Sequence, residues 1–474
     1  MAVTCYYKSL LCSRKFSHCS KNLSVLFSTS PSAHRKRKWS KGRVSAAWPD
    51  ERTWEERLAD AVTPLWRLTY DEQLEIKQRK LEHILTQLCR HISQSSTSKM
   101  NFPLLPILRS PVVDGYRNKS TFSINRGVDG HPKTVGYYLG TGRQGNIVCV
   151  SGDHLNNLPD KHKLVARHYQ DFARMSSLEP CLLFHTGGNW RELTVRTNNA
   201  GHTMAVVYFH PQRLTQEEVG LHKAELVDYF TSGPGSVCQL DSLFFQESTK
   251  TRCTHEESPY QLLYGLPHIY EEVLCFCFRI SADAFFQVNQ AAAQVLYGTV
   301  RDLCVPDLGG TKTGGTLLDV CCGTGAIGIT LSPRVDRIIG IELIEQAVKD
   351  ARHNAEVNYV SNCEFIPGKA EVVLPKLMLQ MGSSYGSVTA VVNPARAGLH
   401  YRVIRALRNQ TAIRRLVYVS CKPDGEAMRN FQELCCAPDP LKKLTAEPFS
   451  PTLAVPVDMF PHTEHCELVL LFER

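Results

Sequence analysis

The feature that most constrains the fold is the alternation of strand-type and helix-type segments in residues 281–474. Apolar runs predict strands at Thr316–Cys322, Arg337–Leu343, Cys363–Pro367, Val388–Pro394, Arg414–Cys421 and Cys466–Arg474. Apolar residues at helical spacing predict helices at Asn289–Leu303, Glu345–Val357 and Leu399–Gln410. Strands that alternate with helices pair in parallel, so the sequence predicts an α/β fold with a Rossmann-like, doubly wound and mostly parallel sheet.

Two further structured regions precede this alternation. Residues 50–100 carry apolar residues at helical spacing, and Thr53 is in position to cap the first helix. Residues 101–280 alternate short β-type runs with Gly, Asn and Asp turns, and they include one helix-type segment at 216–231. We therefore predict a helical segment at 50–100, a mainly antiparallel β domain at 101–280 and the α/β domain at 281–474.

The first 49 residues differ in charge from the rest of the chain. They contain ten Lys and Arg and no acidic residue, which leaves 44 basic and 46 acidic residues in the remainder. A basic, Ser-rich and acid-free segment is typical of a mitochondrial presequence, so we predict that residues 1–49 are disordered and direct the chain to the mitochondrial matrix. The alternative is a disordered basic arm that binds RNA or a nuclear importer through His34–Arg43.

The 18 cysteines do not follow a secretory or metal-binding pattern. They lie in apolar segments of a long chain, which fits a reducing compartment. Since no two of them are spaced C-x-x-C, we predict neither a zinc site nor an iron–sulfur cluster. No apolar run reaches the ~18 residues that cross a bilayer, and we predict no membrane partner. The oligomeric state is left open.

The segment LLDVCCGTGAIG, Leu317–Gly328, predicts a nucleoside-binding turn. It is a strand followed by a glycine-rich turn and a helix, and glycines let a ligand approach the backbone closely. Glu342 ends the next strand, 19 residues after Gly323. This is close to the ~20 residues typical of nucleoside-binding α/β folds, and a carboxylate there can accept both hydroxyls of a ribose. The form of the turn favours S-adenosyl-L-methionine over a dinucleotide.

Two later strands end in polar residues on one rim. Asn393 and Pro394 follow the apolar run of the fourth strand, and Cys421 follows the run Leu416–Val419. In a doubly wound sheet the carboxyl ends of the strands border the ligand crevice. We therefore predict that Asn393 and Cys421 face the methyl donor. The alternative for Cys421 is a small buried residue at a strand end.

Six motifs in order resemble those of the RNA (uracil-5-)-methyltransferases. They are AFFQVN (Ala284–Asn289), DVCCGTG, GIEL, NPARAG, VSCKP and FPHTEHCE (Phe460–Glu467). Residues 101–474 resemble the tRNA-modifying branch, which implies the T-loop uridine of tRNA as the substrate, with rRNA as a second candidate. The family commonly has Asp-Pro-Pro-Arg where this chain has Asn393-Pro394-Ala395-Arg396. It commonly has Asn-Pro where this chain has Lys422-Pro423-Asp424.

Methylation of C5 in uracil requires a thiolate and a base. A thiolate that adds to C6 makes C5 nucleophilic towards a methyl sulfonium, and a base must then remove the C5 proton so that the thiolate can leave. Cys421 supplies the thiolate, and we expect Lys422 and the polar rim to lower its pKa. By resemblance Glu467 is the base, with Glu464 and His465 as alternatives.

The resemblance also assigns the remaining contacts. The residues expected to contact or border S-adenosyl-L-methionine are Gln287, Cys321, Gly323, Glu342 and Asn393. Arg396 is expected to hold the target base or a phosphate, with a salt bridge at a helix start as the alternative.

Further RNA contacts are suggested by residue type alone. Tyr116, Arg117 and Lys119 combine aromatic and cationic groups that suit stacking and phosphate contact on single-stranded RNA, although a solvated edge strand would look the same. A second cationic series that could contact phosphates comprises Arg402, Arg405, Arg408, Arg414 and Arg415.

Two other functions remain open at this point. An RNA cytosine C5-methyltransferase also uses a cysteine, and the C-terminal carboxylate favours uracil over cytosine. A non-catalytic RNA-binding factor with a retained cofactor pocket is suggested by Asn393, whereas Cys421 and Glu467 argue against it.

Overall fold

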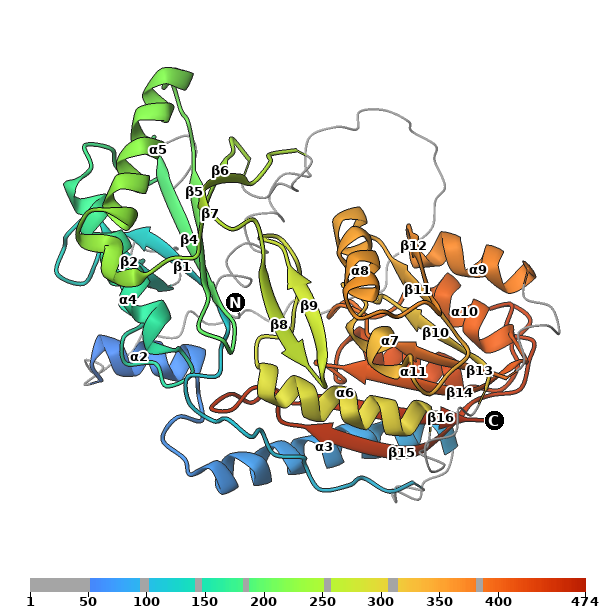
Figure 1. Ribbon diagram of the computed structural model, residues 1–474. Coiled ribbons are helices and arrows are strands. Elements are labelled where there is room, and N and C mark those ends of the chain that lie inside the picture. Colours follow the sequence, from blue (N-terminus) through green and yellow to red (C-terminus); the bar gives the residue numbers. More distant parts are fainter. Residues whose placement is uncertain are drawn as a thin grey trace, which may run out of the picture.

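The computed structural model describes residues 52–93, 102–140, 147–181, 187–250, 257–305, 314–380 and 387–474. The predicted targeting segment, residues 1–49, lies outside the described residues. Two seven-stranded sheets make up most of the chain, and a two-stranded hairpin, β8 (Ile269–Val273) with β9 (Phe276–Ile280), lies between them (Figure 1).

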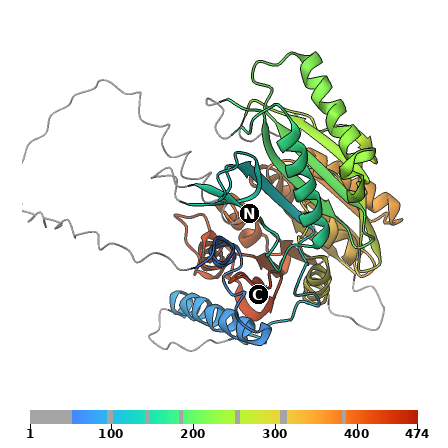
Figure 2. The ribbon, with the colours of Figure 1, turned by 90° about the vertical axis from the view of Figure 1, so that its left-hand side faces the viewer.

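Two helices come first in the described chain. α2 (Trp54–Val62) is capped by Thr53, whose side chain accepts a hydrogen bond from the backbone N–H of Glu56. The Glu56 side chain in turn accepts one from the backbone N–H of Thr53. This capping box satisfies two N–H groups that a helix start otherwise leaves unpaired, and it confirms the predicted cap. α3 (Tyr70–Ser93) follows and runs beside the C-terminal segment of the chain (Figure 2).

The region after these helices forms a sheet of order β3-β2-β1-β4-β5-β6-β7. Its strands are β1 (Lys119–Asn125), β2 (Thr134–Leu139), β3 (Val148–Val150), β4 (Trp190–Thr197), β5 (Thr203–Phe209), β6 (Ser242–Glu247) and β7 (Gln261–Gly265). Every pair is antiparallel except β5 with β6, and α5 (Gln216–Thr231) lies in the crossover between those two strands. The expected mainly antiparallel sheet and the helix at 216–231 are thus present.

The C-terminal sheet has the order β12-β11-β10-β13-β14-β16-β15. Its strands are β10 (Thr316–Val320), β11 (Arg337–Glu342), β12 (Cys363–Pro367), β13 (Val388–Val392), β14 (Ile413–Ser420), β15 (Ser450–Val457) and β16 (Glu467–Glu473). The first five strands of this order pair in parallel, and β16 runs antiparallel to β14 and β15. The chain changes direction across the sheet between β10 and β13, which is where such sheets bind ligands.

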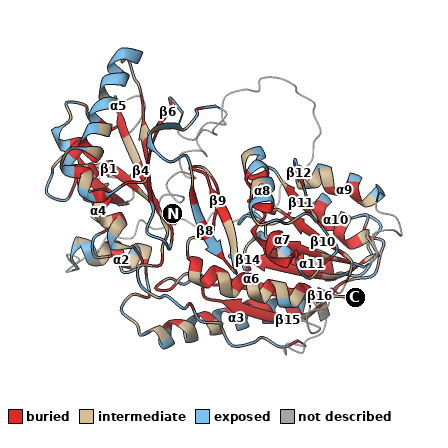
Figure 3. Cartoon of the chain, viewed as in Figure 1, coloured by how far each residue is buried: buried red, intermediate tan, exposed pale blue. Residues whose placement is uncertain are grey.

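Helices cover both faces of this sheet. In chain order, the helices of this domain are α6 (Gln290–Cys304), α7 (Ala326–Leu331), α8 (Glu345–Val357), α9 (Ala370–Gln380), α10 (Tyr401–Asn409) and α11 (Glu426–Cys435). α6, α7, α8 and the β8–β9 hairpin pack on one face, and α9, α10, α11 and the N-terminal α3 pack on the other. The strands are buried from both sides, as Figure 3 shows, so they read as continuous apolar runs.

Some elements were not predicted. α4 (Asp160–Met175), α9, α11 and β15 have no counterpart in the sequence prediction. α4 did carry a signal, because its buried Val165, Tyr169 and Phe172 recur at helical spacing. None of the described helices combines the length and hydropathy needed to cross a bilayer.

Candidate active site

One cavity of about 920 Å³ draws its lining from both sheets and from α2. Apart from the second arginine series, the site residues predicted from the sequence line it: Tyr116, Arg117, Lys119, Gln287, Cys321, Gly323, Glu342, Asn393, Arg396, Cys421 and Glu467. They span 352 positions of the chain, so only the tertiary fold brings them together.

The glycine-rich turn forms one wall of the cavity. Gly323 and Gly325 have φ angles of 57° and 81°, in the left-handed region that glycine adopts without strain. Cys321 is also left-handed, with a φ of 66°, which is uncommon for a residue with a side chain. The backbone N–H groups of Cys321 and Cys322 both donate to the carbonyl of Ile341, so the turn is tied to the next strand.

Glu342 is fixed at the end of β11 by two backbone groups. Its Oε2 accepts a hydrogen bond of 3.0 Å from the N–H of Gly323, and its Oε1 accepts one of 2.9 Å from the N–H of Ile344. A carboxylate has about four acceptor positions, so both oxygens can still accept from a ligand. Glu342 is therefore held in place to bind a pair of hydroxyl groups.

The surroundings of Glu342 fit a nucleoside. No heavy atom outside the turn lies within 4 Å of the position that a Cβ would take at Gly323, so there is open space against the backbone. Leu343 and Ile344, 56% and 50% exposed, offer apolar surface beside the carboxylate. Open space, an apolar wall and a fixed carboxylate suit the adenosine part of S-adenosyl-L-methionine.

Gln287 and Asn393 approach this wall from other elements. Gln287 is buried on the segment before α6, and its backbone carbonyl accepts a bond of 2.9 Å from the side chain of Asn118. Asn393 follows β13, and its N–H donates to the carbonyl of Val320 at 3.3 Å. Both side chains border the same cavity as the glycine-rich turn.

Cys421 and Glu467 come from neighbouring strands. β14 and β16 are antiparallel, and Ser420 is paired with Leu468. The next positions along the two strands are Cys421 and Glu467, which both face the cavity. Glu467 is the first residue of β16 and is 3% exposed, in agreement with its predicted place at a strand start near the core.

Burial sets the protonation of this pair. Burial, and then the charge of Glu467, raise the pKa of the Cys421 thiol, while the positive charge of the nearby Arg396 lowers it. Burial also raises the pKa of Glu467 to about 8, against the opposing charge of Arg396. In the free protein near neutral pH both groups therefore hold their protons.

This result corrects the expectation for Cys421. We expected Lys422 to lower the pKa of the thiol, but the thiol pKa is raised and the cation that acts on it is Arg396. Lys422 is exposed, and its methylene groups lie over Gly425. Adjacency in sequence was a poor guide, because successive side chains at a strand end point to different sides.

The other thiols near the cofactor wall are in less reactive surroundings. Burial and the charge of Glu342 raise the pKa of Cys321 to about 12. The same two influences, together with Asp319, raise the pKa of Cys322 well above its usual value. Cys421 differs from them in having a guanidinium as a partner.

The two alternatives for the base are less suited to the role. Glu464 is more than half exposed and pairs with Lys80 at 3.4 Å. His465 borders the cavity, and burial, followed by the charge of Arg396, lowers its pKa. Glu467 is the buried carboxylate beside Arg396, with the raised pKa that a general base near neutral pH needs.

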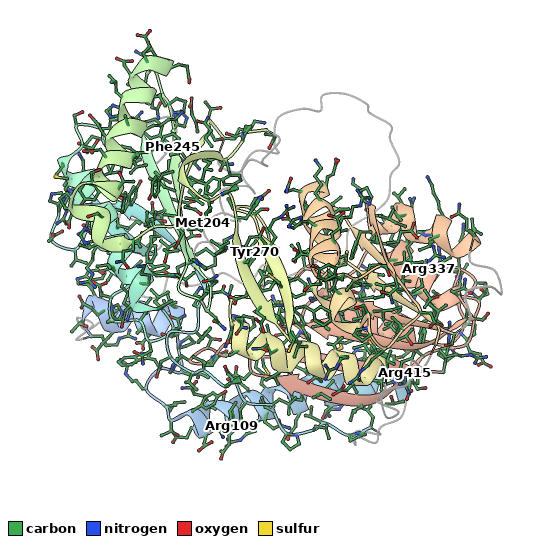
Figure 4. All side chains as sticks on the ribbon, viewed as in Figure 1. Arg109, Met204, Phe245, Tyr270, Arg337 and Arg415 are labelled. Atoms are coloured by element: carbon green, nitrogen blue, oxygen red, sulfur yellow. The ribbon has the colours of Figure 1, made fainter. Side chains whose placement is uncertain are left out.

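The predicted arginine series separates into two groups. Arg408 is fully buried and donates to the carbonyls of Ala446, Glu447 and Cys436. Arg415 pairs with Glu473 at 2.7 Å (Figure 4). These two arginines hold the fold together, which overturns the suggestion that they contact phosphates.

The remaining members of the series are exposed to different degrees. Arg402 and Arg414 are exposed, and Arg405 is partly exposed. Arg402 and Arg405 lie 6.0 Å and 5.9 Å from the ring of Tyr401, on the helix whose start borders the cavity. Arg414 is at the amino end of β14, whereas Cys421 follows the carboxyl end of that strand.

The aromatic ring that is exposed in the cavity is that of Phe285, whereas Tyr116, which residue type suggested for stacking on RNA, is buried. Tyr116 is only 6% exposed, and its hydroxyl donates to the carbonyl of Pro461, so it supports the cavity wall. Phe285 is 67% exposed and borders the cavity, where an aromatic ring can stack on a base. Residue type alone offers no means of choosing Phe285 over its buried neighbour Phe286.

The comparisons with known proteins identify the family of the chain. The family model for tRNA (Uracil-5-)-methyltransferase matches residues 272–474. The chain is 66% identical over 426 residues to tRNA (uracil-5-)-methyltransferase homolog B of Danio rerio, covering 89% of this chain and 88% of the relative. It is 55% identical over 445 residues to homolog B of Homo sapiens, covering 92% and 87%.

More distant proteins share the family or the fold. Homolog A of Mus musculus is 41% identical over 432 residues, covering 88% of this chain and 69% of the relative. The crystal structure of Pyrococcus abyssi tRNA (uracil-54, C5)-methyltransferase in complex with S-adenosyl-L-homocysteine is similar in fold. Its TM-score is 0.61 at 23% identity, over 86% of this chain and 84% of that one. The chain belongs to the S-adenosyl-L-methionine-dependent tRNA (uracil-5-)-methyltransferase family, as its motifs predicted.

Proposed function

We propose that this protein methylates C5 of the T-loop uridine in mitochondrial tRNA, with Cys421 as nucleophile and Glu467 as proton acceptor. The observation that carries the proposal is the placement of these two side chains at adjacent positions of paired strands, in a cavity that also holds Glu342. One cavity thus contains a nucleophile, a base and a nucleoside-binding carboxylate.

The first step is addition of the Cys421 thiolate to C6 of the uracil ring. A carbon–sulfur bond forms, and the electron pair of the C5–C6 double bond moves towards O4, which makes C5 an enolate carbon. The thiol is protonated in the free protein, so it must lose its proton before it reacts. The positive charge of the Arg396 guanidinium stabilises the thiolate.

S-adenosyl-L-methionine, when bound, supplies an electrophilic methyl group on a positively charged sulfur. Glu342, Gly323, Gln287 and Asn393 are the residues that would hold it in the cavity that Cys421 also lines. C5 of the enolate would take up that methyl group: the methyl–sulfur bond would break as the carbon–carbon bond forms, and S-adenosyl-L-homocysteine would leave. The ring then carries both a methyl group and a proton on C5.

The last step removes that proton. The Glu467 carboxylate takes the proton from C5, the double bond re-forms, and the thiolate leaves C6. A methyl group has then replaced one proton on the base, and Cys421 is regenerated. Because the pKa of Glu467 is about 8, its carboxylate is a stronger base than an exposed one, and it releases its proton to solvent more readily as the pH approaches 8.

A uridine in folded RNA must leave its stack to reach this cavity. The volume of about 920 Å³ accommodates a nucleotide base together with a nucleoside cofactor. The exposed ring of Phe285 offers a stacking surface that replaces part of the base stacking that flipping removes.

The test is nucleoside analysis of unmodified mitochondrial tRNA incubated with the protein and labelled S-adenosyl-L-methionine. We expect 5-methyluridine with the wild type, and a loss on the order of 10³-fold or more with Cys421→Ala. With Glu467→Gln we expect the protein–RNA adduct to accumulate, because the C5 proton is no longer removed. Formation of 5-methyluridine by Cys421→Ala would overturn the assignment of the nucleophile.

The same assay separates the alternatives. 5-Methylcytidine would identify a cytosine methyltransferase, and product on rRNA would add rRNA as a second substrate. A wild type that binds RNA and cofactor, forms no adduct with 5-fluorouridine RNA and makes no product would be a binding factor. In that case Asn393→Asp is the first variant to test.

The mitochondrial location rests on the acid-free, basic composition of residues 1–49. Residues 1–49 fused to a fluorescent protein should direct it to mitochondria. A fusion in which Arg14, Lys15 and Lys21 are replaced by Gln should not. Nuclear accumulation of the first fusion would favour the importer-binding alternative.

A further inference from the structure

We infer that Arg117, Lys119 and Arg196 form a site for a backbone phosphate of the RNA strand whose base enters the cavity. The inference rests on the proposed function, since it assumes an RNA substrate. Arg117 and Lys119 line the cavity. Arg196 lies behind them in the β-rich sheet and was not singled out from the sequence.

The pairing of the strands places two of these cations face to face. Lys119 on β1 is directly opposite Arg196 on β4 in the antiparallel register. Like charges in directly opposed positions destabilise a sheet, because their side chains project to the same face about 5 Å apart. Arg117 precedes Lys119 by two positions and adds a third positive charge. Such an arrangement is expected where an anion binds.

Arg196 lacks a full set of partners. It is 3% exposed, and its Nη2 donates to the carbonyl of Ala284 at 2.6 Å. Its Nη1 has no hydrogen-bond partner among the described residues. A buried guanidinium that keeps one N–H-bearing nitrogen unpaired is costly in free energy, and the cost falls when an acceptor arrives.

The balance of charge around these residues is positive. None of the three cations forms an ion pair with a carboxylate in the described part of the chain, and the acidic residue that acts on them electrostatically from the cavity wall is Asp283. Asp350 also acts on Arg196, but its charge is matched by Arg279, with which it pairs at 2.8 Å. The cluster therefore keeps an excess of positive charge that suits a phosphodiester, which carries a single negative charge.

Lys119 shows the effect of these uncompensated charges. Burial, together with the charges of Arg196 and Arg117, lowers its pKa to about 7, and Asp283 opposes them. The neighbouring Tyr137 on β2 and His162 on α4 hold no charge near pH 7, because burial raises the pKa of Tyr137 to about 12 and lowers that of His162 to about 3. Near neutral pH Lys119 is therefore the group that can take up a proton when an anion binds.

The position of the cluster favours RNA over the carboxylate of the cofactor as the source of the anion. The cations belong to β1, β4 and the segment before β1, in the β-rich sheet, whereas the nucleoside-binding turn and Glu342 belong to the C-terminal sheet (Figure 1). The two parts are joined by Asn118, whose N–H donates to Val288 at 2.8 Å and whose side chain donates to Gln287. A phosphate at the cluster would thus lie beside the segment that contacts the cofactor.

The test measures RNA binding and proton uptake together. The full-length protein is titrated with unmodified tRNA in a calorimeter, near pH 7, in two buffers that differ in ionisation enthalpy. The wild type should take up a fraction of a proton on binding, because Lys119 becomes fully protonated. Lys119→Arg should bind tRNA with similar affinity and without that uptake, since an arginine stays protonated.

Lys119→Met gives the second arm. We expect its Kd for tRNA to rise about tenfold and the slope of log Kd against log salt to fall by about one, as when one phosphate is no longer neutralised. Lys163→Met, on α4 in the same region but not in the cavity lining, is the matched control and should behave as wild type. Thermal unfolding of each variant checks that it is folded.

Three outcomes would overturn the inference. One is an unchanged tRNA Kd in Lys119→Met. Another is proton uptake that persists in Lys119→Arg. The third is weaker binding of S-adenosyl-L-homocysteine with unchanged tRNA binding, which would assign the cluster to the cofactor carboxylate. Failure of the proposed function is distinguishable from all three, because it would appear as a wild type that binds tRNA with proton uptake and yet forms no 5-methyluridine.

Discussion

At the scale of single residues, Arg396 links the proposed nucleophile and the proposed base. Its positive charge lowers the pKa of both Cys421 and Glu467, whereas burial raises both. Burial makes the Glu467 carboxylate more basic, and Arg396 partly offsets the effect of burial on the Cys421 thiol. The residue at 393, where the family commonly has aspartate, is an uncharged Asn393 on the same cavity wall, so it adds no negative charge that would raise these pKa values further.

The pH dependence of the reaction follows from these shifts. A carboxyl group with a pKa of about 8 is protonated below that pH, so kcat/KM should rise with pH through about 8. It should go on rising above about pH 8, because burial also raises the pKa of the Cys421 thiol, which must be deprotonated to react. Arg396→Gln removes the cation that lowers both pKa values, and the rising limb should move to higher pH. Arg429→Gln, which pairs with Glu433 on the surface, is the control. If the rise of kcat/KM with pH occurred at the same pH in Arg396→Gln as in the wild type, this role for Arg396 would be contradicted.

Glu467 should also make stability depend on pH. Its pKa is raised from 4.5 to about 8 on folding, so its contribution is favourable below pH 4.5 and is lost as the pH rises through 8. The free energy of unfolding of the wild type should therefore fall between about pH 5 and pH 9, relative to Glu467→Gln, by several kcal/mol, because a pKa change from 4.5 to about 8 corresponds to roughly 5 kcal/mol. Chemical denaturation at several pH values measures the difference, and parallel curves for the two proteins would rule it out.

At the scale of elements, α3 holds the loop that leads into β16. Lys77 Nζ lies 2.7 Å from Asp458 with both side chains fully buried, and it also donates to the carbonyl of Phe460. Gln73 accepts from the N–H of His462 at 2.7 Å, and His462 pairs with Asp114 at 2.7 Å. The loop between Asp458 and Glu467 borders the cavity, so a helix almost 400 residues away in sequence shapes the site.

Lys77→Met should test this support. It leaves the Asp458 carboxylate buried without its cation, which costs about 3–5 kcal/mol of stability, and the displaced loop should lower kcat more than it raises KM. The double variant Lys77→Met/Asp458→Leu removes both charges and should recover much of the lost stability. Equal stability of Lys77→Met and wild type in urea denaturation would show that the pair is not important.

At the scale of the whole molecule, the recognition of RNA has to come from local charge. Residues 50–474 carry 44 basic and 46 acidic residues, so no general positive charge attracts a polyanion. The structure sorts the arginines near the cavity by role. Arg408 and Arg415 support the fold, and Arg402 and Arg405 lie beside Tyr401 at the cavity rim.

Replacement of both rim arginines should weaken RNA binding without a matching loss of stability. Arg402→Ala/Arg405→Ala should raise the Kd for tRNA and reduce the salt dependence of log Kd by about two, one for each phosphate that is no longer neutralised. Arg414→Ala, at the amino end of β14, should leave the Kd unchanged. Fluorescence anisotropy at several salt concentrations measures both. A larger increase of the Kd for tRNA in Arg414→Ala than in Arg402→Ala/Arg405→Ala would place the RNA at the amino ends of the strands instead.

The fold class and one wall of the cavity follow from local pattern in the sequence. Strand ends in a parallel sheet share one rim, so a glycine-rich turn, Glu342, Asn393 and Cys421 could be placed together from that pattern alone. Other features of the site depend on the packing of distant segments. The support of the loop by Lys77, the exposure of Phe285, the cation opposite Lys119 and the partner of Cys421 all depend on long-range packing. Burial sets protonation, and burial is a property of the folded chain as a whole.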